Sequence, residues 1–123
     1  MSQARVLYYG LAVIYLVGVV VQFFLVGLAL FGSGNYDVHR VLGYALGLIA
    51  VALLALAIGA KLSRSLTALT TVLVALNAVQ IVVIQIDMDQ IEALHVVNAL
   101  AIAFVANMLV QRSRRYLAAQ MAT

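Results

Sequence analysis

The chain contains two histidines, His39 and His95, and each follows a glutamine in an apolar segment. Gln22 precedes His39 by 17 residues, and Gln80 precedes His95 by 15 residues. Imidazole is the commonest neutral metal ligand in proteins. Because one pattern is repeated around the only two histidines, it predicts a single metal centre held from two sides by His39 and His95.

Small residues follow each histidine at four-residue steps. They are Gly43 and Gly47 after His39, and Ala99 and Ala103 after His95. On an α-helix these positions share the face of the preceding histidine. A smooth face of this kind would accept a planar guest such as haem, but it would equally let two membrane helices pack closely. The sequence leaves both interpretations open.

Charged and polar residues near the histidines could orient the imidazoles or a cofactor. Arg40 could bind an anionic propionate group, or it could pair with Asp37 or Glu92. Glu92 and Asn98 stand three residues before and after His95, where either side chain could flank that imidazole.

Amides within the apolar segments have two possible roles. Gln22 and Gln80 could donate a hydrogen bond to a bound cofactor, or they could join neighbouring helices. For Asn77 and Asn107 we expect only hydrogen bonds between helices. The predicted cofactor-binding set is therefore His39, His95, Arg40, Gly43, Gly47, Ala99, Gln22, Gln80 and Glu92.

The composition indicates a membrane protein. Of the 123 residues, 67% are hydrophobic and 9% are charged, and the mean hydropathy is +1.16. A soluble core could not absorb this much apolar surface. The absence of cysteine excludes disulfides, thiolate ligands and iron–sulfur clusters.

Four helices are predicted at about residues 6–31, 38–60, 66–86 and 91–115. The apolar stretch in each is long enough to cross a hydrocarbon layer of about 30 Å. Short connections make consecutive helices antiparallel neighbours. We expect an all-α protein: a single transmembrane domain over residues 1–123, an up-down-up-down four-helix bundle built from two repeated helical hairpins.

The charges predict the orientation of this bundle. Basic residues gather at one end of it, namely Arg5, Lys61, Arg64, Arg112, Arg114 and Arg115. The acidic residues gather at the other end, with Arg40 as the only cation there. The positive-inside rule then places both termini in the cytoplasm, in a multi-pass protein of a prokaryotic cytoplasmic membrane. We expect no nucleic-acid partner, because the basic residues stand where membrane orientation requires them.

In this topology the histidines begin the two helices that run from outside to inside, so they lie at similar depth on opposite sides of the bundle centre. A haem b iron with two histidine ligands has no open position, so its task would be one-electron transfer near the outer face rather than catalysis. Possible partners are the lipid bilayer, a quinone, respiratory-complex subunits or further copies of the chain. The alternative from another class is a structural subunit without a cofactor.

Two short elements resemble motifs of the haem A synthase family. Residues 39–43, His-Arg-Val-Leu-Gly, are similar to its His-Arg-x-x-Gly element, and residues 92–95, Glu-Ala-Leu-His, to its Glu-x-x-His element. The matching positions are Gln22, His39, Arg40 and Gly43 in one hairpin, and Gln80, Glu92, His95 and Ala99 in the other.

This resemblance covers nearly the whole chain and implies a haem-binding membrane bundle. Typical members carry two bundles in tandem and join the two motifs in one helix, whereas here the motifs begin different helices. A maturation enzyme related to haem A synthase would therefore have to act as an oligomer. The resemblance adds this enzyme as a further alternative to the electron carrier.

Overall fold

A computed structural model describes residues 3–86 and 89–121, except for the side chains of residues 89–92 and 120–121. This part of the chain forms four long helices. They are α1 (Gln3–Leu30), α2 (Tyr36–Gly59), α3 (Arg64–Val83) and α4 (Asp89–Met121). The predicted all-α four-helix bundle is confirmed, and three of the helices match the expected bounds to within three residues. Helix α4 runs six residues further than expected.

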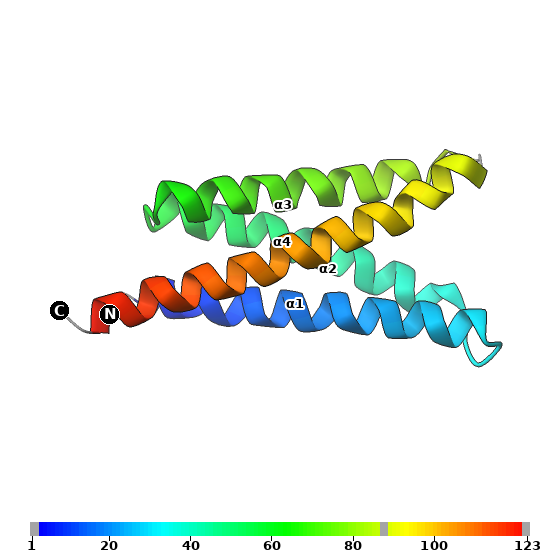
Figure 1. Cartoon of the computed structure of the whole chain (residues 1–123), viewed down its shortest axis with the longest axis horizontal. Helices are drawn as coiled ribbons and strands as arrows, with labels where there is room; N and C mark the ends of the chain where they lie inside the picture. The colour runs from blue at the N-terminus through cyan, green and yellow to red at the C-terminus, as the bar shows by residue number, and fades with distance from the viewer. Residues whose placement is uncertain (1–2, 87–88, 122–123) are drawn as a thin grey trace.

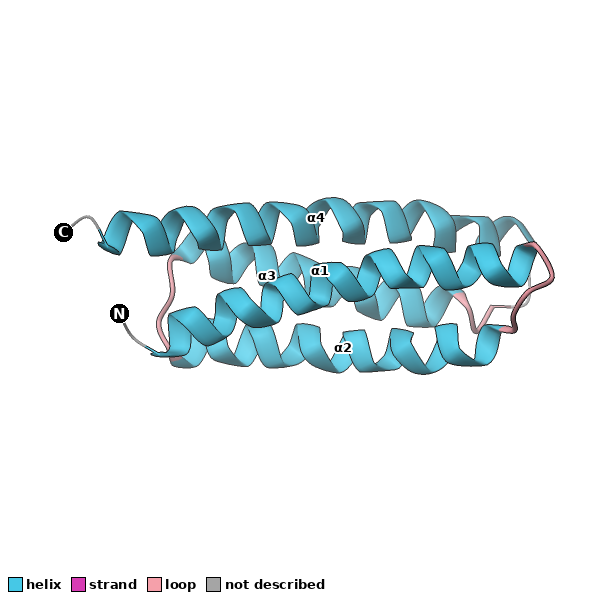
Figure 2. Ribbon diagram, turned by 90° about the horizontal axis from the view of Figure 1, so that it is seen from below, coloured by secondary structure: helices cyan, strands magenta, loops and turns pink. Residues whose placement is uncertain are grey.

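Consecutive helices run in opposite directions, and both termini lie at the same end of the bundle as the connection between α2 and α3 (Figures 1 and 2). Each helix packs against two neighbours, in the closed order α1, α2, α3, α4 and back to α1. The two diagonal pairs are therefore α1 with α3 and α2 with α4. This arrangement brings the starts of α2 and α4, which carry the histidines, to one end of the bundle.

The buried residues recur at steps of three and four along every helix. Examples are Tyr8, Ala12, Tyr15 and Val19 in α1, and Leu46, Ala50, Leu53 and Ala57 in α2. A seam with this spacing favours the nearly parallel packing of a left-handed bundle. The opposite faces expose large apolar side chains such as Leu48 and Phe104. Because all four helices are also long and apolar enough to cross a membrane, the fold fits a multi-pass membrane protein.

Two connections end the preceding helix in the same way. At the end of α1, Gly32 has a φ of +76°, and Ser33 N–H donates to the carbonyl oxygen of Leu28. At the end of α2, Lys61 has a φ of +49°, and Leu62 N–H donates to Ala57. Both are left-handed helix caps that reverse the chain within a few residues.

Two tyrosines of α1 cross the bundle centre to the diagonal helix α3. Thr70 Oγ1 donates to the carbonyl oxygen of Leu66, so the hydroxyl of Tyr8, 2.5 Å from Thr70 Oγ1, is the donor between these two side chains. Seven residues further along α1, Tyr15 accepts a 2.7 Å hydrogen bond from Asn77. These bonds occupy the centre of the bundle between its middle and the end that carries the termini. The prediction that Asn77 joins helices is therefore confirmed.

Candidate functional site

The two histidines meet across the other diagonal, at the end of the bundle opposite the termini. His39 lies in the first turn of α2, and His95 lies in the second turn of α4. Their ring centroids are 6.2 Å apart, with an angle of 63° between the ring planes. The expectation that topology brings the two imidazoles to one depth, facing each other across the centre, agrees with this geometry.

The same contact between side chain and backbone joins each hairpin beside its histidine. Gln22 Nε2 in α1 donates to the carbonyl oxygen of His39 at 3.0 Å. Gln80 Nε2 in α3 donates to the carbonyl oxygen of His95 at 3.1 Å. The repeat seen in the sequence therefore corresponds to one repeated hydrogen bond. The sequence left two roles open for these glutamines. The structure shows one of them, because both side-chain amides donate to the neighbouring helix.

In the second hairpin, linked hydrogen bonds set the orientation of two side-chain amides, those of Gln80 and Asn98. Asn98 Nδ2 donates to the carbonyl oxygen of Leu76 at 2.9 Å and to Gln80 Oε1 at 2.5 Å. Because Gln80 Oε1 accepts from Asn98, its Nε2 is the group that faces His95. Gln80 Nε2 lies 3.1 Å from His95 Nε2 as well as from the His95 carbonyl oxygen.

These hydrogen bonds also select the tautomer of a neutral His95. An amide N–H₂ is a donor only, so a neutral His95 must present the lone pair of Nε2 to Gln80 and carry its proton on Nδ1. A histidine that binds a metal through Nε2 needs this same tautomer. Of the two residues expected to orient His95, Asn98 does so through Gln80, and the Glu92 side chain lies outside the described residues.

The first hairpin lacks an equivalent set of linked hydrogen bonds. The position that corresponds to Asn98, three residues after the histidine, holds Leu42. Gln22 Oε1 and His39 Nδ1 are both buried and have no hydrogen-bond partner in the described part of the chain. The two halves therefore share the backbone contact but differ in the side chains, and His39 is held less tightly than His95.

A tyrosine that the sequence pattern did not place at this site lies beside His39. The ring of Tyr36, one turn earlier in α2, lies edge-on to the His39 ring, with centroids 6.4 Å apart and an interplanar angle of 82°. Its position near the start of α2 is typical of a tyrosine that anchors a helix at a membrane interface. The spacing of three residues before His39 on the same helix was the signal that could have indicated this contact.

A neighbouring side chain fills the space beside Gly43, whereas Gly47 lines an open cavity. A Cβ atom added to Gly43 would lie 3.0 Å from Gln22 Nε2, and one added to Gly47 would lie 3.8 Å from Ile81 Cδ1. Gly43 therefore gives the Gln22 amide room to reach the His39 carbonyl oxygen. Close approach of a neighbouring helix therefore accounts for Gly43, and both roles stay open for Gly47, which lines a cavity.

Two other residues of the predicted site, Arg40 and Ala99, neighbour the histidines along α2 and α4. Arg40 is exposed and forms no ion pair with Asp37 within the described residues. Ala99 is half-buried one turn after His95 in α4. Groups of three or more potential metal ligands are not found among the described side chains. Among the described side chains at this end, the two imidazoles therefore form a pair without a third clustered ligand.

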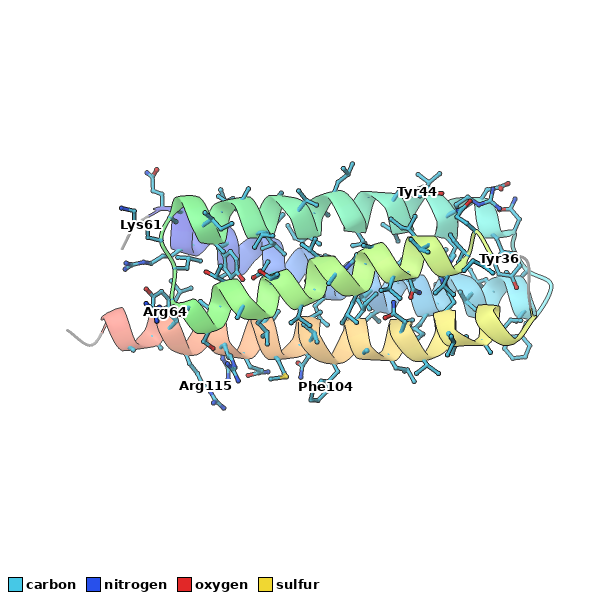
Figure 3. The ribbon with its side chains drawn as sticks, turned by 90° about the horizontal axis from the view of Figure 1, so that it is seen from above. Tyr36, Tyr44, Lys61, Arg64, Phe104 and Arg115 are labelled. Atoms are coloured by element: carbon cyan, nitrogen blue, oxygen red, sulfur yellow. The ribbon has the colours of Figure 1, made fainter. Side chains whose placement is uncertain are left out.

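A cavity of about 370 Å³ opens between α2 and α3, in the half of the bundle that carries the histidines. Apolar side chains form most of its wall, together with Asn77 and the ring of Tyr44. Tyr44 lies near the same end as Tyr36 (Figure 3). The cavity is a groove on the outside of the helix pair, separate from the hydrogen-bonded contacts of the two histidines.

Fold and site together define a membrane-type four-helix bundle with a histidine pair on its axis. The chain belongs to DUF6220, a family of unknown function, whose profile matches residues 22–86. The match covers just over half of the chain and includes Gln22, His39 and Gln80. No curated protein and no solved structure matches the chain.

Proposed function

We propose that the protein is a membrane haem protein in which His39 and His95 bind one haem b iron and the bound haem transfers single electrons. The observation that carries this proposal is the pairing of the only two histidines across the bundle centre, with ring centroids 6.2 Å apart. Two imidazoles that coordinate one metal ion from opposite sides, with metal–nitrogen distances of about 2.0–2.1 Å, have ring centroids roughly 6 Å apart. The donor set and its spacing therefore fit a two-ligand centre.

The surrounding hydrogen bonds also suit such a centre. His95 already has the tautomer that ligation through Nε2 requires, because Gln80 faces that nitrogen with donors only. His39 Nδ1 is buried without a hydrogen bond in the described part of the chain, so it is not committed to another protein group. Gln22 and Gln80 hold the backbone beside the two ligands. We infer that Gln80 releases Nε2 when the metal binds and keeps its bond to the His95 carbonyl oxygen.

Two histidine ligands leave haem iron without an open coordination position, and such a group supplies one-electron chemistry. The protein would position the haem and exclude competing reactions, with no catalytic residue of its own. The positive-inside rule supports a cytoplasmic location for the termini, because Lys61, Arg64 and Arg115 lie at their end of the bundle (Figure 3). The haem would then lie near the outer face of a prokaryotic cytoplasmic membrane. A quinone or the subunits of a respiratory complex are the proposed redox partners.

A structural subunit without cofactor is the second candidate, and one observation favours it. Every amide N–H of Gln80 and Asn98 already has an acceptor within the bundle, and the space beside Gly43 is filled by the Gln22 amide. The site is therefore well packed as it stands. A maturation enzyme related to haem A synthase, acting as a homo-oligomer, is the third candidate, supported by the short motifs around His39 and His95.

A reduced-minus-oxidised visible spectrum distinguishes the first two candidates. The wild type would be purified from haem-supplied cells beside His39→Ala and His95→Ala. Gln85→Ala, which changes an exposed polar residue at the same end, is the matched control. Sharp low-spin bands in the wild type and control that are lost in both histidine variants would support ligation by the pair.

A wild type that stays colourless after haem supplementation would refute the haem proposal and leave the structural subunit. Bands that survive in one histidine variant would refute the shared site. Turnover of haem b to a modified haem by an oligomer of the chain would identify the maturation enzyme.

A further inference from the structure

A polar surface lies on α4 at the end of the bundle that carries the termini. Asn107, Gln111, Arg112 and Arg115, together with Met108, line a shallow cavity of about 260 Å³. The four polar residues are all exposed. Arg115 points away from the bundle, as Phe104 does further along the same helix (Figure 3). The prediction that Asn107 joins two helices is wrong, because Asn107 lies on the outer face of α4 without a hydrogen bond to the described residues.

The depth of this cavity follows from a contact between helices. Arg112 Nη1 donates to Ser65 Oγ, in the first turn of α3. Arg112 is therefore level with the start of α3, where the apolar bundle ends. Asn107 lies five residues along α4 toward the middle of the bundle, which is about 7.5 Å deeper at the rise of an α-helix. The cavity therefore extends from the level of the first turn of α3 toward the apolar middle of the bundle.

The polar groups of the cavity suit an anionic ligand. Two guanidinium groups and two side-chain amides present N–H donors, and no carboxylate is among the residues that line the cavity. Of the acidic residues, Asp37 lies at the start of α2, and Asp89 and Glu92 lie at the start of α4, at the opposite end of the bundle. An exposed amide such as Asn107 is costly in hydrocarbon unless an acceptor reaches it. The ligand should therefore bring negative charge at the boundary and uncharged acceptors below it.

A second copy of the chain fits this surface poorly. A two-fold interface through this face would bring Arg112 and Arg115 close to the same residues of the partner. Like charges that approach in a medium of low dielectric constant repel strongly. A glycerophospholipid has both required groups, because its phosphate lies at the membrane boundary and its ester carbonyl oxygens lie just below.

We propose that Asn107, Gln111, Arg112 and Arg115 form a binding site for an anionic glycerophospholipid. Arg112 and Arg115 bind the phosphate and the charged headgroup, and Asn107 and Gln111 donate to the ester carbonyl oxygens. This site is at the opposite end of the bundle from the histidines and does not depend on haem binding. The bound lipid would hold α4 at a fixed depth in the membrane.

The test is a titration of the full chain in dodecyl maltoside with dioleoyl phosphatidylglycerol, in which native mass spectrometry measures bound lipid. The variant Arg112→Gln/Arg115→Gln should bind phosphatidylglycerol roughly thirtyfold more weakly if each arginine contributes as a surface cation does. The control Arg64→Gln/Arg114→Gln removes the same charge from the same end but outside the cavity. It should bind within about twofold of the wild type.

Several results would overturn the proposal. Equal weakening in both double variants, or equal binding of dioleoyl phosphatidylcholine, would contradict a specific site for an anionic lipid. Displacement of the lipid by millimolar sodium phosphate would indicate a free-phosphate site instead. A wild-type dimer that is lost in Asn107→Leu would assign the face to a second copy of the chain.

Circular dichroism would check that each variant keeps its helix content. If the arginine variant fails to fold, Asn107→Leu/Gln111→Leu replaces it. This variant should lose the lipid while keeping both positive charges, and unchanged binding would refute the role given to the amides.

Discussion

The side-chain amide of Gln80 holds His95 at two atoms, the ring Nε2 and the backbone carbonyl oxygen, each 3.1 Å away. Its counterpart Gln22 reaches only the carbonyl oxygen of His39. The two glutamines occupy equivalent places in a repeated structure but have different numbers of partners. This difference leads to a direct comparison of matched variants.

Gln80→Leu should destabilise the bundle more than Gln22→Leu. The first change removes both bonds to His95 and leaves Asn98 without one acceptor, and we expect a loss of about 1–2 kcal/mol. The second removes one bond and should cost about 0.6 kcal/mol, near the average for such bonds in membranes. The measurement is the free energy of unfolding in mixed micelles of increasing SDS content. Equal losses would contradict the asymmetry between the hairpins.

Gly43→Ala should act through Gln22. The added Cβ would lie 3.0 Å from Gln22 Nε2, so the amide must shift away from the His39 carbonyl oxygen, and we expect a loss of about 0.5–1 kcal/mol. In a Gln22→Ala background the same change should be neutral or slightly stabilising, because alanine is the better helix former. A double-mutant cycle of unfolding free energies measures this coupling. Additive effects would mean that Gly43 serves some other contact.

Gly18→Ala should destabilise the bundle, and Gly10→Ala in the same helix should not. The added Cβ at Gly18 would lie 2.6 Å from Leu46 Cδ2, whereas at Gly10 nothing lies within 4 Å. Because Leu46 is buried, it must leave its packed position, at a cost of about 1–3 kcal/mol. The penalty should shrink in a Leu46→Ala background. Thermal unfolding followed by circular dichroism provides the comparison, and equal midpoints for both glycine variants would show that Leu46 moves freely.

Tyr15→Phe tests the hydrogen bond that crosses the bundle centre. The change removes the acceptor for Asn77 Nδ2, which keeps its 2.8 Å bond to the carbonyl oxygen of Leu73. We expect a loss of about 0.5–1.5 kcal/mol, the usual range for one such bond. Tyr9→Phe is the matched control, because the Tyr9 hydroxyl makes no hydrogen bond within the described residues. If both variants unfold alike in SDS, the central bond adds no stability.

The number of helices and their pairing could be predicted from the sequence, because hydrophobic runs and short connections constrain both directly. The ends of the helices were harder to predict from the sequence. Helix α4 continues to Met121, beyond the predicted end at residue 115, because hydropathy reports only the part of a helix that lies in the apolar layer. The cap at Lys61 was also missed, since lysine gives no sign of a positive φ.

Of the candidate site, the approach of His39 to His95 was predicted, because topology alone places the starts of α2 and α4 together. The partners of the side chains were not. The sequence could not show that the space beside Gly43 belongs to Gln22, nor that Asn98 reaches His95 through Gln80. Such contacts depend on how each helix is rotated about its axis and on side-chain conformation. A repeated sequence pattern gives no information about either.

The repeated bond from glutamine to the carbonyl oxygen of histidine makes the chain resemble a dimer whose two protomers have been fused. In a true homodimer both hairpins would carry asparagine after the histidine, or both would carry leucine. The fused chain has Leu42 in one hairpin and Asn98 in the other. The His95 ring is thereby held by a side-chain hydrogen bond from Gln80, and the His39 ring has no equivalent bond from Gln22. Two identical subunits could not hold their histidines in two different ways.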